Sequence, residues 1–125
     1  TDHATYKHGL AIALSDEGSM MDWFDAKSAC GRKAAFSGAS WMLPSKDQWK
    51  TMFRTNGGNE ESYTGLNAAL AAAGGSKFQE DYYWSSTSGG DVNYASSVCP
   101  EDGTAFWYQR GKWADDIRVR ACLAF

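Results

Sequence analysis

The order of the predicted elements favours an α+β fold. Helical apolar patterns fill the first half of the chain, and strand-like runs between glycine-rich turns fill the second half. One further strand is predicted before the helices. With 125 residues, the chain is long enough for one core and too short for two domains. We therefore expect residues 1–125 to form a single domain, excised from a longer protein.

The N-terminal segments predict one strand and one helix. Tyr6 to Leu14 ends in alternating apolar residues, which is typical of a strand. Met20 to Ala35 places apolar residues at spacings of three and four, which predicts one buried helix face. The residues of this face are Met20, Trp23, Ala26 and Cys30. Gly38 to Leu43 then crosses to the next element.

Two further helices are predicted before the strand-rich half. Ser45 to Gln48 has the pattern of a capping box, in which Ser45 accepts a backbone N–H and Gln48 reaches back. The helix that follows is expected to end at Asn56-Gly57-Gly58. An alanine-rich third helix is expected from Ser62 to Ala73.

The second half contains short strands separated by turns. Turns are predicted at Gly89-Gly90, Asp102-Gly103 and Gly111-Lys112. The final segment, Ile117 to Phe125, becomes apolar on both faces, which favours a strand in the middle of a sheet. The expected core tryptophans are Trp23, Trp41, Trp49, Trp84 and Trp107.

Composition excludes several classes of partner. The net charge is -3 and the pI is about 5.2, which argues against nucleic-acid binding. No apolar run approaches the roughly 18 residues of a membrane span, so we expect no direct membrane insertion. The three cysteines lack CxxC spacing, which argues against zinc, and they leave one disulfide or none open.

Three motifs carry a resemblance to a known family. They are Trp41 to Trp49 (WMLPSKDQW), Tyr83 to Thr87 (YWSST) and Val119 to Phe125 (VRACLAF). In this order they resemble the DUF1566 and Fibrobacter succinogenes major paralogous domain families of bacterial surface proteins. They also resemble the variable proteins of diversity-generating retroelements from gut Bacteroidetes. The resemblance covers about Trp23 to Phe125.

The resemblance implies a C-type-lectin-like fold. Such a fold has two main helices and a small twisted, mainly antiparallel sheet with paired N- and C-terminal strands. The segment Ser62 to Ala73 would then be an inserted third helix. In vertebrate C-type lectins a cysteine of the first helix is bonded to one of the last strand. Cys30 and Cys122 lie at comparable places, so the resemblance allows a disulfide between them, although bacterial relatives often lack it. The resemblance also implies an extracellular or cell-surface location, as an outer-membrane lipoprotein or a pilus-associated protein.

Strand alternation predicts a display surface on residues 104–110. If Trp107 faces the core, Phe106, Tyr108 and Arg110 face solvent, and tyrosine and arginine are enriched in binding hot spots. The alternative is a strand that is buried on both faces. We expect a ligand-binding module for a protein or glycan on another cell, and no enzyme. The expected contact residues are Asp91, Asn93, Tyr94, Ser96, Thr104, Phe106, Tyr108, Arg110, Asp115 and Asp116.

The retroelement resemblance adds an argument from codons. Diversification alters adenines, chiefly in AAC codons, and these codons cannot become Gln, Glu, Lys, Met or Trp. All ten expected contact residues are reachable in this way. The residues of the segment 88–116 that are unreachable, and are therefore expected to be invariant scaffold, are Glu101, Trp107, Gln109, Lys112 and Trp113.

Two alternative functions remain open at this point. A calcium-dependent lectin would use Asp115, Asp116 and Glu101, although Ala114 supplies no side-chain oxygen at the asparagine position of the lectin motif. An enzyme of the formylglycine-generating type would need a reactive cysteine at Cys99 or Cys122. Apart from calcium in the first alternative, no cofactor is expected.

Overall fold

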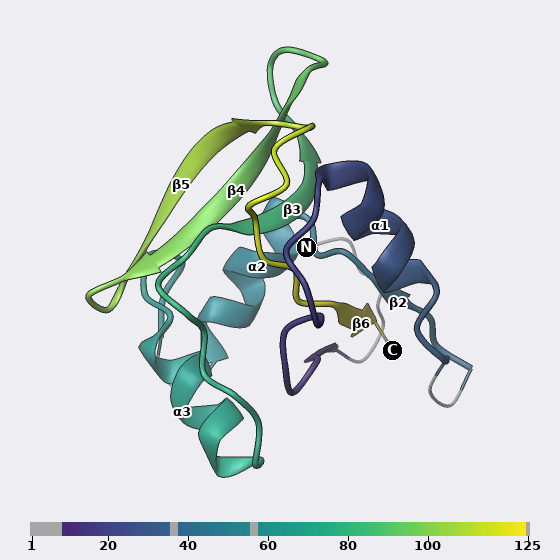
Figure 1. The fold of residues 1–125 in the computed structure, drawn as a ribbon. Helices are drawn as coiled ribbons and strands as arrows, with labels where there is room; N and C mark the ends of the chain where they lie inside the picture. The colour runs from purple at the N-terminus through teal and green to yellow at the C-terminus, as the bar shows by residue number, and fades with distance from the viewer. Residues whose placement is uncertain (1–8, 36–37, 56–57, 125) are drawn as a thin grey trace.

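The computed structural model describes residues 9–35, 38–55 and 58–124 and confirms the α+β class. These residues form three helices and two antiparallel three-stranded sheets (Figure 1). The elements in chain order are β1 (Leu10–Ile12), α1 (Trp23–Gly31), β2 (Trp41–Met42), α2 (Lys46–Phe53), α3 (Thr64–Ala72), β3 (Tyr83–Ser88), β4 (Tyr94–Glu101), β5 (Thr104–Gly111) and β6 (Cys122–Ala124).

The smaller sheet joins the two ends of the described chain, in the order β1-β6-β2. Leu10 is paired with Ala124, and Ile12 with Cys122. The predicted pairing of the first and last strands is therefore confirmed, and β6 is the central strand, as its apolar faces indicated. The last strand begins later than predicted, since residues 117–121 form other backbone hydrogen bonds. The Arg118 N–H, for example, donates to the Tyr82 carbonyl, and the Arg118 carbonyl accepts from the Trp84 N–H. The predicted strand residues 6–8 and 125 lie outside the described part.

The helices begin where side chains cap them. Asp22 accepts a hydrogen bond from the Asp25 backbone N–H at 2.8 Å, so α1 begins after Met20 rather than at it. The capping box of α2 is confirmed, because Ser45 and Gln48 exchange side-chain-to-backbone bonds of 3.1 and 2.8 Å. α2 ends earlier than expected, at Phe53. None of the described helices has the length and hydrophobicity of a membrane span.

Two apolar clusters lie on opposite faces of the β3-β4-β5 sheet. Adjacent residues of a strand point to opposite faces, so Tyr83 packs with Trp49 in one cluster and Trp84 packs with Trp23 in the other. The indole N–H groups also bind the scaffold: Trp49 donates to the Trp84 carbonyl at 3.1 Å, and Trp23 to the Ser85 carbonyl at 2.9 Å. The segment Tyr83 to Thr87 is therefore structural.

The expectation of five core tryptophans is correct for three of them. Trp23, Trp49 and Trp84 are buried. Trp41 and Trp107 are half-buried and pack against the edges of the clusters. The reason is their position: Trp41 lies on a two-residue edge strand, and Trp107 lies on the edge strand β5.

A buried ion pair ties the N-terminal segment to the last segment of the chain. Arg120 is 0% exposed and donates from Nε to Asp16 Oδ1 at 2.7 Å. Its Nη1 donates to the Ser76 carbonyl at 2.7 Å. The Tyr83 hydroxyl donates to the other carboxylate oxygen of Asp16 at 2.8 Å. Asp16 thus links the segment before β6 to β3.

Candidate functional site

The β4–β5 hairpin forms the predicted display surface. Its turn is Asp102-Gly103, with positive φ at both residues (49° and 84°), as the two-residue hairpin turn requires. The register runs without a bulge from the pair Glu101–Thr104 to the pair Tyr94–Gly111. Directly paired residues of an antiparallel sheet share a face, so this register decides which side chains lie together.

The predicted alternation of β5 is confirmed. Ala105 is 4% exposed and belongs to the core, and Trp107 packs against the same cluster. On the opposite face, Phe106 and Tyr108 are 43% and 45% exposed. The strand is therefore anchored at Ala105 and Trp107 and open to solvent at Phe106 and Tyr108, and the alternative of burial on both faces is wrong. The contrast weakens at the end of the strand, where Gln109 is exposed and Arg110 is half-buried.

Tyr108 forms a cluster with Tyr82 and Arg110, and Phe106 lies on the same face of β5. The Tyr82 and Tyr108 rings meet edge to face at 5.3 Å, and the Arg110 guanidinium lies 4.4 Å from the centre of the Tyr82 ring. Arg110 also contacts Asp116 at 3.4 Å. We call Tyr82, Phe106, Tyr108 and Arg110 the recognition face.

Tyr82 was not among the predicted contact residues. It comes just before β3, on the opposite side of the chain from the core residue Tyr83. The same alternation that was applied to β5 would have assigned it to this face. Its role depends on strand pairing, which brings residue 82 beside residue 108.

Two predicted contact residues do not belong to the recognition face. Ser96 is 3% exposed; its hydroxyl accepts a bond from the Gln109 amide at 3.2 Å, and its carbonyl accepts one from Ser85. Tyr94 is 44% exposed, but it lies in the same row of side chains as Ser96 and Gln109. Because alternate residues of β4 face opposite ways, both belong to the other side of the sheet.

The turn residues Asp91 and Asn93 are exposed at one end of the sheet. Asn93 donates its backbone N–H to Asp91 Oδ1 at 2.9 Å, and its carbonyl accepts from the Lys112 N–H at 2.9 Å. The two turns at this end are thereby held together. Thr104 lies at the opposite end of β5, half-buried and bridged to Ser62.

The expected scaffold residues of this region differ in their environments. Lys112 is 7% exposed and donates to the Ser88 hydroxyl at 3.0 Å, in agreement with a scaffold role. Trp113 is 65% exposed, so burial does not hold this residue in place as it holds Lys112. Trp113 lies in the turn that follows β5, which is closed by a bond of 3.0 Å from the Ala114 N–H to the Gly111 carbonyl.

The three residues of the calcium hypothesis do not come together. Asp115 and Asp116 are exposed after the end of β5, whereas Glu101 lies at the hairpin turn, a full strand length away. Within residues 9–35, 38–55 and 58–124, no three His, Cys, Asp or Glu side chains are grouped so that they could hold a metal ion.

The cysteine environments disfavour a nucleophilic thiolate. Cys30, Cys99 and Cys122 are buried and are free thiols in the structure, in contrast to the Cys30–Cys122 disulfide that the resemblance allowed. Burial raises the pKa of Cys30 and of Cys122 to about 12. Burial also raises the pKa of Cys99, and nearby carboxylates, first among them Glu101, add to this effect. A reactive cysteine has a lowered pKa.

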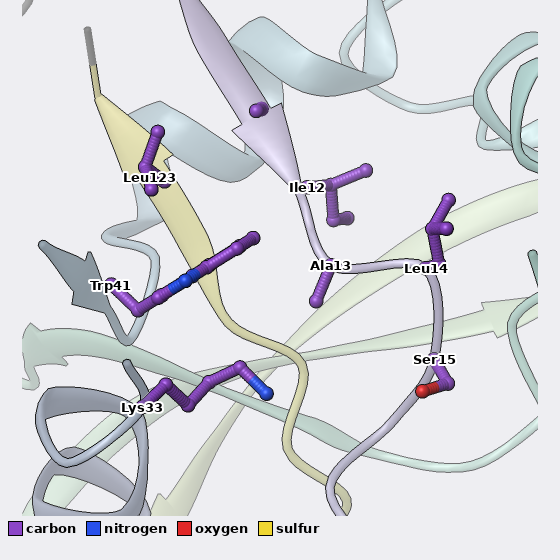
Figure 2. A pocket seen from close by; sticks show the side chains of 8 residues that line it. Ile12, Ala13, Leu14, Ser15, Lys33, Trp41 and Leu123 are labelled. Atoms are coloured by element: carbon purple, nitrogen blue, oxygen red, sulfur yellow. The ribbon is translucent and has the colours of Figure 1, made fainter. Parts of the chain in front are cut away.

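A hollow of about 420 Å³ lies beside the smaller sheet (Figure 2). Its walls are mainly apolar, and the Trp41 ring and Leu123 lie on the side opposite β1 in Figure 2. Lys33 reaches this hollow, but its ammonium group is paired with Glu17 at 3.0 Å. None of the predicted contact residues lines it, so it is separate from the recognition face.

No family model matches this chain, and none of the curated proteins does so at a significant level. A function must therefore be argued from the geometry of the recognition face and from the sequence motifs.

Proposed function

We propose that this chain is a ligand-recognition module with a C-type-lectin-like fold, and that it binds a protein or glycan on another cell through the recognition face. The pairing of β1 with β6 and the positions of α1 and α2 support this fold. In this interpretation α3 is an insertion. The motif resemblance supports a place at the bacterial surface, on an outer-membrane lipoprotein or a pilus.

The observation that carries the proposal is the two-sided character of β5. Trp107 and Ala105 anchor the strand to the core, while nearly half of the surface of Phe106 and of Tyr108 is exposed to solvent. An exposed aromatic cluster on a rigid sheet offers large contact area at low cost in conformational entropy. Arg110 lies over the Tyr82 ring and so presents an oriented guanidinium group to a ligand.

The same arrangement is suited to a surface that varies. Replacement of Phe106 or Tyr108 removes no fully buried side chain, so the fold tolerates other residues at these positions. Trp107 and Gln109, which adenine-directed mutation cannot produce from an AAC codon, lie on the opposite side of β5. We therefore extend the proposal to diversification of this face by a retroelement.

The other candidate functions have weaker support. A calcium-dependent lectin would have to bind its ion without Glu101, since that residue is remote from Asp115 and Asp116. An enzyme of the formylglycine-generating type would need a reactive thiol, and burial raises the pKa of all three cysteines.

The proposal is tested with an array of extracellular proteins and glycans, probed with and without a calcium chelator. For each ligand found, the double variant Tyr108→Ala/Arg110→Ala should lower affinity about 30-fold or more, as expected when hot-spot residues are removed. The matched control is Tyr94→Ala/Arg54→Ala, which removes an exposed tyrosine and an exposed arginine outside the face. Equal affinity of the two double variants, or binding abolished by the chelator, contradicts the proposed mechanism.

A further inference from the structure

A second hollow, of about 390 Å³, is lined by side chains from both α1 and α2. We call it the interhelix hollow. It shares only Trp41 with the hollow of Figure 2, and none of the residues of the recognition face lines it. The side chains that decide its chemistry are Lys27, Trp41, Met42, Leu43, Gln48 and Ser86.

One wall of the interhelix hollow is apolar. Trp41 and Met42 are half-buried on β2, and Leu43, directly after that strand, is 4% exposed. The strand is held in place, because Trp41 pairs with Leu123 of the central strand β6. Firmly held apolar side chains around a few polar groups are typical of small-molecule sites. This wall therefore suits the hydrocarbon part of a small ligand.

A buried amide on α2 has a free donor. Gln48 is 7% exposed, and its Oε1 accepts the Ser45 backbone N–H at 2.8 Å in the capping box. Its Nε2 carries two N–H groups, but within the described residues this atom donates only to the Met42 sulfur, at 3.5 Å, and a thioether is a weak acceptor. A nearly buried donor without an oxygen partner lowers stability unless water or a ligand accepts its bond. The Gln48 amide therefore favours a polar ligand in the hollow that it lines.

Lys27 brings a positive charge without a counterion. Its ammonium group lies 4.4 Å from the centre of the Trp23 ring, and it takes part in no ion pair within residues 9–35, 38–55 and 58–124. The positions three and four residues away on α1 hold Trp23, Phe24, Cys30 and Gly31, so this side of the helix offers no carboxylate. Among the described residues that line the interhelix hollow, none is acidic.

Ser86 completes a set of three donors. Its backbone N–H donates to the Pro44 carbonyl at 2.8 Å, which fixes the residue at the edge of the hollow. An ammonium, an amide N–H and a hydroxyl can all donate, so together they favour a ligand group that only accepts hydrogen bonds. A carboxylate is such a group, and its single charge matches the single charge of Lys27, whereas a phosphate carries up to two.

We propose that the interhelix hollow binds a small organic carboxylate. Its oxygens accept hydrogen bonds from the Lys27 ammonium, the Gln48 Nε2 and the Ser86 hydroxyl. Its hydrocarbon part lies against Trp41 and Met42. The site shares no residue with the recognition face, so the proposal does not depend on the function proposed above.

The probe is 4-methylpentanoate, and its comparison is 4-methylpentanamide, which has the same carbon skeleton without the charge. Binding is followed by NMR through the Trp41 indole N–H and the Gln48 side-chain amide. We expect the carboxylate to bind about tenfold more tightly than the amide, as for hydrogen bonds to a charged group. Inorganic phosphate is the third probe and should bind more weakly than the carboxylate, because it has no apolar part. Equal affinities for carboxylate and amide, tighter binding of phosphate, or no saturable shift with any of the three would overturn the proposal.

Substitutions assign the binding to the hollow. Lys27→Met removes the charge but keeps a long side chain over Trp23, and it should weaken binding of 4-methylpentanoate about tenfold. Gln48→Glu keeps an acceptor for the capping box and places a negative charge beside the ligand, so it should abolish binding. Lys77→Met is the matched control, since Lys77 is exposed and does not line the hollow.

Urea midpoints close to that of the parent protein show that each variant is folded when binding is measured. Unchanged affinity in Lys27→Met, or an equal loss in Lys77→Met, contradicts the proposal. Neither result bears on the recognition face.

Discussion

Two phenylalanines at contrasting depths provide a direct test of the recognition face. Phe53 is 0% exposed and packs against Trp49 and Phe78, with ring centres 5.6 and 6.4 Å apart. Phe53→Ala removes a complete core ring and leaves a cavity, so it should lower the free energy of unfolding by about 3–5 kcal/mol. Phe106 is 43% exposed, so only a little over half of its ring is withdrawn from water. Because water fills the space that Phe106→Ala leaves, the expected cost is about 1–1.5 kcal/mol.

The assay is urea unfolding followed by tryptophan fluorescence, with both variants and the parent protein analysed at a common slope. The two substitutions delete the same atoms. The difference between their unfolding free energies therefore reports how the surroundings of the two rings differ. A difference of roughly 2 kcal/mol or more is expected. If Phe106→Ala is as costly as Phe53→Ala, the exposed side of β5 is part of the core, and the recognition face is refuted.

Three further predictions concern the scaffold. Asp16→Asn leaves the buried Arg120 without its counterion and should lower the free energy of unfolding by about 3–5 kcal/mol in urea titrations. Cys30 and Cys122 have folded-state pKa values raised to about 12 from 9.0, so the folded state holds these protons more tightly than the unfolded state. Their contribution to stability is complete below pH 9 and should be lost as the pH rises from about 9 to 12, as measured by urea midpoints across this range. Ser45→Ala removes the cap of α2 and should cost about 1 kcal/mol by the same method.

Each of these predictions has a matched control. Glu60→Gln breaks the exposed pair with Arg54 and should leave stability nearly unchanged, in contrast to Asp16→Asn. The double variant Cys30→Ala/Cys122→Ala should lose stability less steeply above pH 9 than the parent protein. For α2, Ser45→Asp keeps an N-terminal acceptor and should restore most of the stability lost in Ser45→Ala. The opposite order in any of these pairs contradicts the corresponding reasoning.

Local patterns were good guides to the scaffold. The capping box at Ser45 and the turn at Asp102-Gly103 are both present in the structure. The pairing of the terminal strands, which the family resemblance implied, is present as well. Errors arose at boundaries. α1 begins at Trp23 because Asp22 caps it, and an apolar pattern that includes Met20 does not reveal where a cap lies.

The candidate site was predicted in part. Alternation along β5 correctly separated Phe106 and Tyr108 from Trp107, because one buried face is enough to define the phase of a strand. The sequence did not show which residues of β4 face the core, and the expectation that Ser96 lies at the surface is wrong. The codon argument placed Trp113 among the invariant residues, and the structure shows that it is largely exposed. A residue that adenine mutation cannot produce is therefore not necessarily a buried residue.

By itself the sequence determined the α+β class and the type and order of the main elements, and it divided residues 104–110 into two sides without deciding which side is exposed. These features depend on periodicity, caps and turns, which act over a few neighbouring residues. Only the tertiary structure decided which exposed residues meet: Tyr82 beside Tyr108, Arg110 over Tyr82, and Phe24 against Trp113. These contacts join residues from 26 to 89 positions apart in the chain, 108 − 82 and 113 − 24, so they follow from strand register and helix packing and not from local pattern.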